Sequence, residues 1–245
     1  MDPLLISTAS GLRSRMESLD MLANNIANGS TGGYKADREF YSLYTAPEAA
    51  DSVPGADALP VIEKNWIDFS QGELRATGNP LDLALSGKGF FVVQGPAGPL
   101  YTRDGSFQLS PAGLLVTAGG LAVRDAGGGT IALSTSAASP VEITREGEVR
   151  QDGEVAGRIG LVDFADPAAL EKQGRGYFRL ADANARPVAP AAVEVNQGKL
   201  ENSNVSATEA AVRLVTVMRQ FEMLQKVAAL DSDMNRKALE EVAKV

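Results

Sequence analysis

LISTASGLRSRMESLDMLANNI, residues 5–26, is the stretch of this chain with the clearest helical pattern. Small and apolar residues recur in it at alternating steps of four and three, which places them on one stripe of an α-helix. Asp2 and Pro3 suit the start of a helix, and Gly29 directly after Asn28 suits its end. The segment therefore predicts an amphipathic N-terminal helix. Its stripe consists of Leu5, Ala9, Leu12, Met16, Leu19, Ala23 and Ile26.

The other end of the chain repeats this pattern. Ser206 and Glu209 fit a capping box, and no glycine or proline interrupts residues 207–245. This segment predicts one long C-terminal helix whose apolar pattern drifts around the helix. The first stripe is Ala210, Leu214, Val217, Phe221, Leu224 and Ala228, and the later positions are Met223, Val227, Leu230 and Met234.

The middle of the chain has a different pattern. Leu81, Leu83 and Leu85 alternate with other residues, and the apolar run 90–93 follows after a glycine-containing turn. Further short apolar runs separated by turn residues predict an antiparallel β domain. Residues 45–59, rich in Ala, Pro, Asp and Gly, predict an irregular arm.

These patterns together predict an α+β fold. Long N- and C-terminal helices are expected to pair as a coiled-coil-like domain, and a mostly antiparallel β domain is expected between them. The predicted helical domain comprises residues 1–30 and 205–245. Connecting arms are expected at 31–72 and 183–204, and the β domain at 73–182.

Composition excludes several chemistries. The chain has no histidine and no cysteine, so disulfides, cysteine-ligated zinc and histidine-based catalytic triads are impossible. The net charge of −8, which belongs mainly to the residues between the helices, argues against a nucleic-acid binder. No residues are predicted to be catalytic, to bind a cofactor or to bind a metal. We also expect no membrane span and no cleaved Sec signal.

A single amphipathic helix cannot bury its own apolar stripe. The two terminal stripes could pack on the β domain, or they could meet neighbouring subunits. Their heptad spacing and their place at opposite ends of the chain favour packing between subunits.

Several motifs, in order, give the chain a resemblance to a known family. Residues 23–28 (ANNIAN) and 31–35 (TGGYK) resemble the N-terminal motif of bacterial flagellar rod and hook proteins. Residues 71–74, 77–92 and 101–107 also resemble that family. The closing segment 197–205 (QGKLENSNV), followed by the long helix, completes the similarity.

The resemblance implies a non-enzymatic structural subunit of the flagellar basal-body rod, which transmits torque from motor to hook. Residues 218–223 (MRQFEM) look most like the proximal rod proteins. The terminal helices would form the inner tube of the assembly and the β domain its outer wall. The family further implies a periplasmic location in the basal body and export through the flagellar type III apparatus. The implied partners are other copies of the chain and other rod proteins, including the distal rod, with no cofactor, nucleic acid or small-molecule substrate.

We expect the assembly contacts on the two stripes and on the asparagines that follow the first helix. The predicted assembly residues are Leu5, Ala9, Leu12, Met16, Leu19, Ala23, Asn24, Asn25, Ile26, Asn28, Leu214, Val217, Phe221, Leu224 and Ala228. Three alternatives stay open at this point: a distal rod subunit, a non-flagellar adaptor with a coiled coil, and a cell-wall hydrolase. The hydrolase would use carboxylates such as Glu146 and Glu148, which lie in predicted exposed turns.

Overall fold

The computed structural model describes residues 3–45, 58–134, 140–174, 176–181 and 185–242. Within these ranges the chain divides into two compact units, each built from segments that are distant in sequence. The first, here called the helical unit, contains the parts within 1–27, 37–68 and 206–245. The second, here called the β unit, contains 28–36 and 69–205. We describe each unit by itself.

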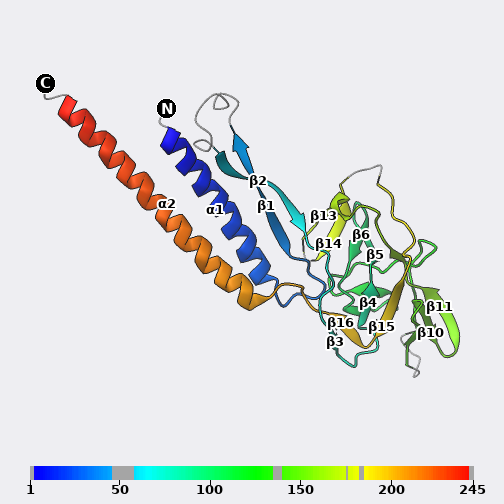
Figure 1. Cartoon of the computed structure of the whole chain (residues 1–245). Coiled ribbons are helices and arrows are strands. Elements are labelled where there is room, and N and C mark those ends of the chain that lie inside the picture. Colours follow the sequence, from blue (N-terminus) through cyan, green and yellow to red (C-terminus); the bar gives the residue numbers. More distant parts are fainter. Residues whose placement is uncertain (1–2, 46–57, 135–139, 175, 182–184, 243–245) are drawn as a thin grey trace. The chain divides into compact units, whose positions relative to one another are not determined.

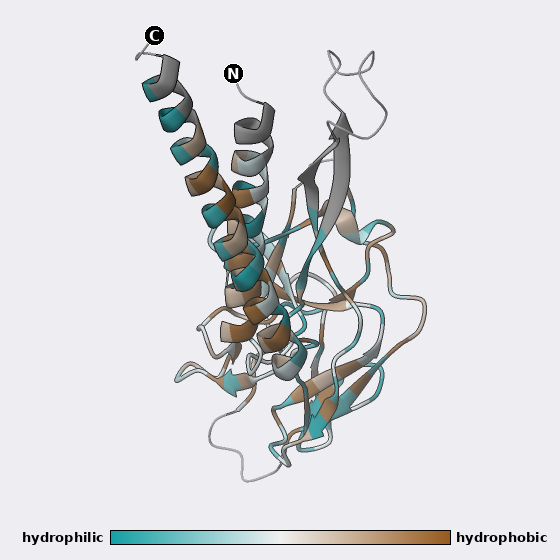
Figure 2. Cartoon of the chain, turned by 60° about the vertical axis from the view of Figure 1, so that its left-hand side comes forward, coloured by the Kyte–Doolittle hydropathy of each residue, from teal (hydrophilic) through white to brown (hydrophobic). Residues whose placement is uncertain are grey.

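Two helices and a hairpin make up the helical unit (Figure 1). Helix α1 spans Pro3–Ala27 and helix α2 spans Ala207–Val242. They lie side by side and antiparallel in both views (Figures 1 and 2), and an added methyl group at Gly11 would lie 3.3 Å from Leu224 Cδ1. Glycine costs a helix interior about 1 kcal/mol relative to alanine, and here its missing side chain lets α2 come close.

The hairpin consists of two antiparallel strands, β1 (Asp37–Thr45) and β2 (Ala58–Ile67). Its register begins with Asp37 opposite Ile67. The sequence predicts a connecting arm over residues 31–72, which includes both strands. Most of the part that is predicted to be irregular, 46–57, lies outside the described residues. The segments on either side of it form paired strands.

The predicted coiled-coil-like helical domain is wrong. One N-terminal and one C-terminal helix are present beside a mostly antiparallel β body, and the helices share their unit with the β1–β2 hairpin. Helix α2 has 36 residues against 25 in α1, so an antiparallel partner of that length cannot cover it. In addition, the buried face of α1 carries mainly small and polar side chains, which do not form the apolar seam of a coiled coil.

The β unit is built from short antiparallel strands. A five-stranded sheet has the order β12-β5-β6-β14-β13, and a three-stranded sheet has the order β11-β10-β9. The two-stranded pairs are β15 with β4, β16 with β3, and β7 with β8. The strands are β3 Leu74–Ala76, β4 Leu83–Gly87, β5 Phe90–Gly95, β6 Gly98–Thr102, β7 Phe107–Leu109, β8 Leu115–Thr117, β9 Glu142–Ile143, β10 Glu148–Gln151, β11 Glu154–Arg158, β12 Leu161–Val162, β13 Leu170–Lys172, β14 Tyr177–Leu180, β15 Val193–Gln197 and β16 Lys199–Glu201, with one 3-10 turn, η2, at Pro167–Ala169.

One apolar core holds these sheets together. Leu83, Leu85 and Phe91 are fully buried in it, and Phe91 meets Phe107 edge-on at 5.1 Å between ring centroids. The alternating leucines at 81, 83 and 85 therefore do what their spacing predicts, since two of the three point inward from β4. The first strands of the unit, β3 and β4, pair with its last, β16 and β15. The first and last strands of the β unit are thus paired with each other.

Candidate assembly interface

Helix α1 turns its predicted stripe mostly away from the core of its own unit. Ala9, Met16, Ala23 and the neighbouring Asn24 are exposed, and the side chain of Leu5 lies outside the described residues. The remaining predicted positions on this part of the chain divide into a half-buried set, Leu12, Leu19, Ile26 and Asn28, and one buried residue, Asn25.

The buried face of α1 is instead largely polar. Ser18 Oγ lies 2.5 Å from Glu39 Oε2, and Glu39 also accepts a hydrogen bond from Arg213. A serine of α1, a carboxylate of β1 and an arginine of α2 are thereby joined, with the Glu39 side chain only 1% exposed. Ser14 Oγ is also buried, and it has no partner among the described residues. Among the α1 side chains that the structure describes, the buried ones are Thr8, Ser14, Ser18, Met21, Leu22 and Asn25.

Asn25 belongs to this inner face by its hydrogen bonds. Its Nδ2 donates to the Asp37 carbonyl at 2.8 Å, and its Oδ1 accepts from the Asp37 amide at 3.0 Å. The side chain thus pairs with β1 as another strand would. The family motif at 23–28 therefore includes a residue that joins α1 to the hairpin of its own chain.

Helix α2 has two apolar faces. The predicted stripe is its inner face, where Val217 is buried and Leu214, Phe221, Leu224 and Ala228 are half-buried. At about 100° per residue, a second set of apolar positions lies on the other side of the helix. We call this set the outer face of α2. It consists of Val212, Met223, Val227, Leu230 and Met234, all exposed, and Figure 2 shows hydrophobic residues along the exposed length of this helix.

A buried charged cluster lies in the β unit, and the sequence analysis did not single it out. Lys35 Nζ is 2.5 Å from Glu201 Oε1, and Arg103 Nη1 is 3.3 Å from Glu201 Oε2. Burial lowers the pKa of the Arg103 guanidinium, and the facing Glu201 carboxylate opposes that shift. The available signal was indirect, since each of the three residues ends or lies within a family motif.

Comparison with known proteins shows which family the chain is similar to. Residues 84–151 match the family described as flagellar hook protein FlgE/F/G D1 domain, and residues 196–241 match flagellar basal body rod FlgEFG protein C-terminal. The chain is 34% identical to the flagellar basal-body rod protein FlgF of Caulobacter vibrioides, over 93% of this chain and 92% of that protein. The chain belongs to the flagellar basal-body rod protein family.

Two further relatives support this membership. FlgF of Mesorhizobium japonicum is 33% identical over 88% of each chain. FlgG of Bacillus subtilis is 33% identical over 91% of this chain and 92% of that protein. The rod-family chain is accordingly a structural subunit of the flagellar basal body and not an enzyme.

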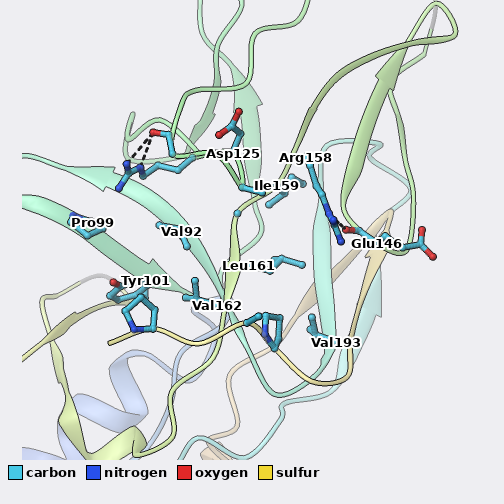
Figure 3. A pocket seen from close by; sticks show the side chains of 18 residues that line it. Val92, Pro99, Tyr101, Asp125, Glu146, Arg158, Ile159, Leu161, Val162 and Val193 are labelled. Carbon is cyan, nitrogen blue, oxygen red and sulfur yellow. Dashed lines mark hydrogen bonds between the residues drawn. The ribbon is translucent and has the colours of Figure 1, made fainter. Parts of the chain in front are cut away.

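The β unit of this rod-family chain has a surface cavity of about 700 Å³ (Figure 3). Its wall is largely apolar, and the charged groups at its edge bond to backbone: Arg124 to the Gly128 carbonyl and Arg158 to the Glu146 carbonyl. The Glu146 carboxylate points away from the cavity in Figure 3, and backbone hydrogen bonding at that residue lowers its pKa. The lining also contains the Asp125 carboxylate, which accepts a hydrogen bond from the Gly129 amide at 2.8 Å and does not point toward Glu146 in Figure 3. The cavity therefore does not present the pair of facing carboxylates that the hydrolase alternative requires.

The residues that the structure describes contain no group of three or more acidic side chains arranged to hold a metal ion. Neither helix, over its described length, is apolar enough to cross a bilayer.

Proposed function

We propose that this rod subunit assembles with other copies of itself and with other rod proteins through two apolar surfaces of its helical unit. The first is the exposed part of the α1 stripe, centred on Ala9, Met16 and Ala23. The second is the outer face of α2. The observation that carries the proposal is the exposure of large apolar side chains on a unit whose buried α1 face is mainly polar.

The energetics support this role. Leu230 is 63% exposed and Met234 is 70% exposed. Burying a side chain of this size stabilises by roughly 1.5–3 kcal/mol, and a row of them is an unusual surface for a monomer. The outer face thus has enough apolar area to favour association.

The two surfaces differ in composition, and this difference favours an open array. The exposed part of the α1 stripe contains two alanines and one methionine, whereas the outer face of α2 carries only valine, leucine and methionine. A contact between unlike surfaces is heterologous, and such contacts propagate into helical assemblies unless the rotation closes a ring. A rod is an assembly of this kind.

The decisive experiment places a charge on the outer face of α2. Leu230→Asp is expected to remove the subunit from purified basal bodies and to abolish motility, because the assembled contact would bury an unpaired carboxylate. Gln225→Asp is the matched control, since it adds the same group to the same helix at an exposed position away from that face. Basal-body composition by mass spectrometry measures both variants. Full incorporation of the Leu230→Asp subunit would contradict the proposal.

For the position in the rod we propose the proximal segment, on the basis of residues 218–223 and the similarity to FlgF proteins. The similarity to FlgG proteins makes the distal segment the second candidate. Complementation distinguishes the proximal from the distal position. The chain should restore motility in a strain from which FlgF has been deleted and should fail to do so in a strain from which FlgG has been deleted. The opposite result would assign it to the distal rod.

The periplasmic location and the type III export route are part of the same proposal and rest on family membership. If the subunit leaves the cytoplasm by this route, it should accumulate inside cells whose flagellar export apparatus is inactive. Its appearance outside the cytoplasm of such cells would refute this route.

A further inference from the structure

The charged cluster of the β unit consists of Lys35, Arg103 and Glu201, and we call these three residues the clasp. The side chains of Lys35 and Glu201 are 0% exposed and that of Arg103 is 4% exposed. One carboxylate is therefore shared by two cations in a site closed to water, so the three side chains together carry one excess positive charge. The Arg103 guanidinium also lies over the Phe90 ring, 5.3 Å from its centroid.

The clasp also binds the backbone at three further positions of the β unit. Lys35 Nζ donates to the Ser70 carbonyl at 2.7 Å, and Arg103 Nη2 donates to the Gly87 carbonyl at 2.7 Å. Glu201 Oε1 accepts from the Gly72 amide at 2.9 Å. Three side chains thus hold the backbone at Ser70, Gly72 and Gly87, in addition to their own segments.

Two of the joined segments lie where the chain first enters the β unit, at residues 28–36, and where it finally leaves it, at residues 202–205. Between them the chain leaves the unit after residue 36 and returns at residue 69. The Gly33 amide donates to the Glu201 carbonyl at 2.8 Å, and the Ala36 amide donates to Asn204 Oδ1 at 2.8 Å. The entering and leaving segments therefore run against each other at the position of Glu201.

The entering segment fits closely at this point. Gly33 has a φ of +64°, and a Cβ there would lie 2.3 Å from the Asp104 amide nitrogen. Only glycine adopts this conformation with that clearance. The path of residues 31–35 is consequently specific, and Lys35 reaches Glu201 only along it.

General stability is a weak explanation for such a site. Ion pairs of this kind lose much of their attraction to the desolvation of their charges, and apolar side chains of similar volume often stabilise a fold as well or better. The β unit already has a separate apolar core around Phe91. What the charges add is a requirement for particular partners, because any one of them left unpaired is strongly unfavourable.

We infer that Lys35, Arg103 and Glu201 are positioning residues that fasten the entering and leaving segments of the β unit to one another. Glu201 is the central member, and it lies 166 residues after Lys35. The clasp therefore closes only after the C-terminal segment has reached the body. Until then, the two segments that lead to the helices are not held together.

The test is hydrogen exchange on the full chain with Glu201→Gln, which removes the carboxylate but keeps the shape. Three amides report on the clasp: Gly33 and Asn204 in the entering and leaving segments, and Gly72, which donates to Glu201 itself. Core amides report on the rest of the unit: Val92, Leu115 and Ile159. We expect exchange of the first set to accelerate by about a hundredfold or more, and that of the core set to change by less than about tenfold.

The matched control is Glu171→Gln, which removes a carboxylate from the exposed pair with Arg179 and should leave both sets unchanged. If Glu201→Gln does not fold, Lys35→Met is the second variant. It leaves the Arg103–Glu201 pair in place, so the same first set should accelerate, but by less. Equal acceleration of both sets in the folded variant, or no change in the first set, would overturn the inference.

Discussion

Phe91 in the β unit and Met234 in the helical unit are both large apolar residues, yet the first is 0% exposed and the second 70% exposed. The same contrast holds across the two units. Leu83, Leu85 and Phe91 are closed off by their own chain, whereas the described residues leave the outer face of α2 exposed. The β unit thus encloses a large apolar core, and the helical unit carries a row of apolar side chains on its surface.

Polar groups show the reverse pattern. The helical unit buries Ser14, Ser18 and Asn25 along α1, and directional hydrogen bonds join Ser18 and Asn25 to the hairpin. Such bonds define an orientation more than they supply free energy, because a net hydrogen bond contributes only about 0.5–1.5 kcal/mol. These hydrogen bonds position α1 against the hairpin of its own chain.

The largest expected effect tests the β-unit half of the comparison. Phe91→Ala should destabilise the β unit by about 3–5 kcal/mol, because it leaves a cavity in a core without solvent access. Thermal unfolding of the purified chain measures this change in the transition of the β unit. A loss below about 1 kcal/mol would mean that the core is not packed as described.

A smaller effect is expected where α1 meets the hairpin. Asn25→Ala removes both hydrogen bonds to Asp37 and should cost about 1–3 kcal/mol. Ala23→Gln, an exposed change on the same helix, is the control and should alter the unfolding free energy by less than about 0.5 kcal/mol. Equal effects of the two variants in chemical denaturation would show that the inner face of α1 is not specifically held.

A third prediction concerns pH. Burial raises the pKa of the Tyr101 hydroxyl above its ordinary value of 10.0, with Arg124 opposing the shift. The folded state then holds this proton more tightly than the unfolded chain. The corresponding stability is complete below the unfolded pKa and is lost as pH rises through the folded one. Tyr101→Phe should therefore flatten the loss of stability that sets in as pH rises above the ordinary pKa of 10.0, and an unchanged alkaline profile would argue against this assignment.

The smallest effect on the free chain sharpens the other half of the comparison. Met234→Ala should change the unfolding free energy by less than about 0.5 kcal/mol, because the side chain is exposed. The same variant should still weaken incorporation into basal bodies, since it removes apolar area from the proposed contact. If the free chain is instead clearly destabilised, its own residues cover the outer face.

The structure also changes which substitutions are informative. Phe221 is half-buried on the inner face of α2, so a charge there would disturb the fold of the subunit as well as any assembly contact. Leu230 separates these two effects, because it is exposed. The sequence pattern predicted the apolar character of both positions, but it did not distinguish the inner from the outer face.

Local pattern was sufficient for the elements whose cause is local. The steps of four and three, the capping residues and the absence of glycine and proline after residue 207 predict the two helices, because a helix depends on neighbours within one or two turns. Alternating leucines at 81–85 predict β4 in the same way. The motifs at both ends of the chain were enough to indicate the rod family.

Only the tertiary structure decided which face of each helix the chain itself covers, that residues 37–67 contain a hairpin, and that Lys35, Arg103 and Glu201 meet. The sequence pattern favoured contact between the apolar stripe of α1 and other subunits, but it did not identify the face that the chain itself buries, which carries Ser14, Ser18 and Asn25. The physical reason is common to all three. Each result depends on contacts between residues far apart in the chain, and a periodicity identifies a face without naming the partner that covers it.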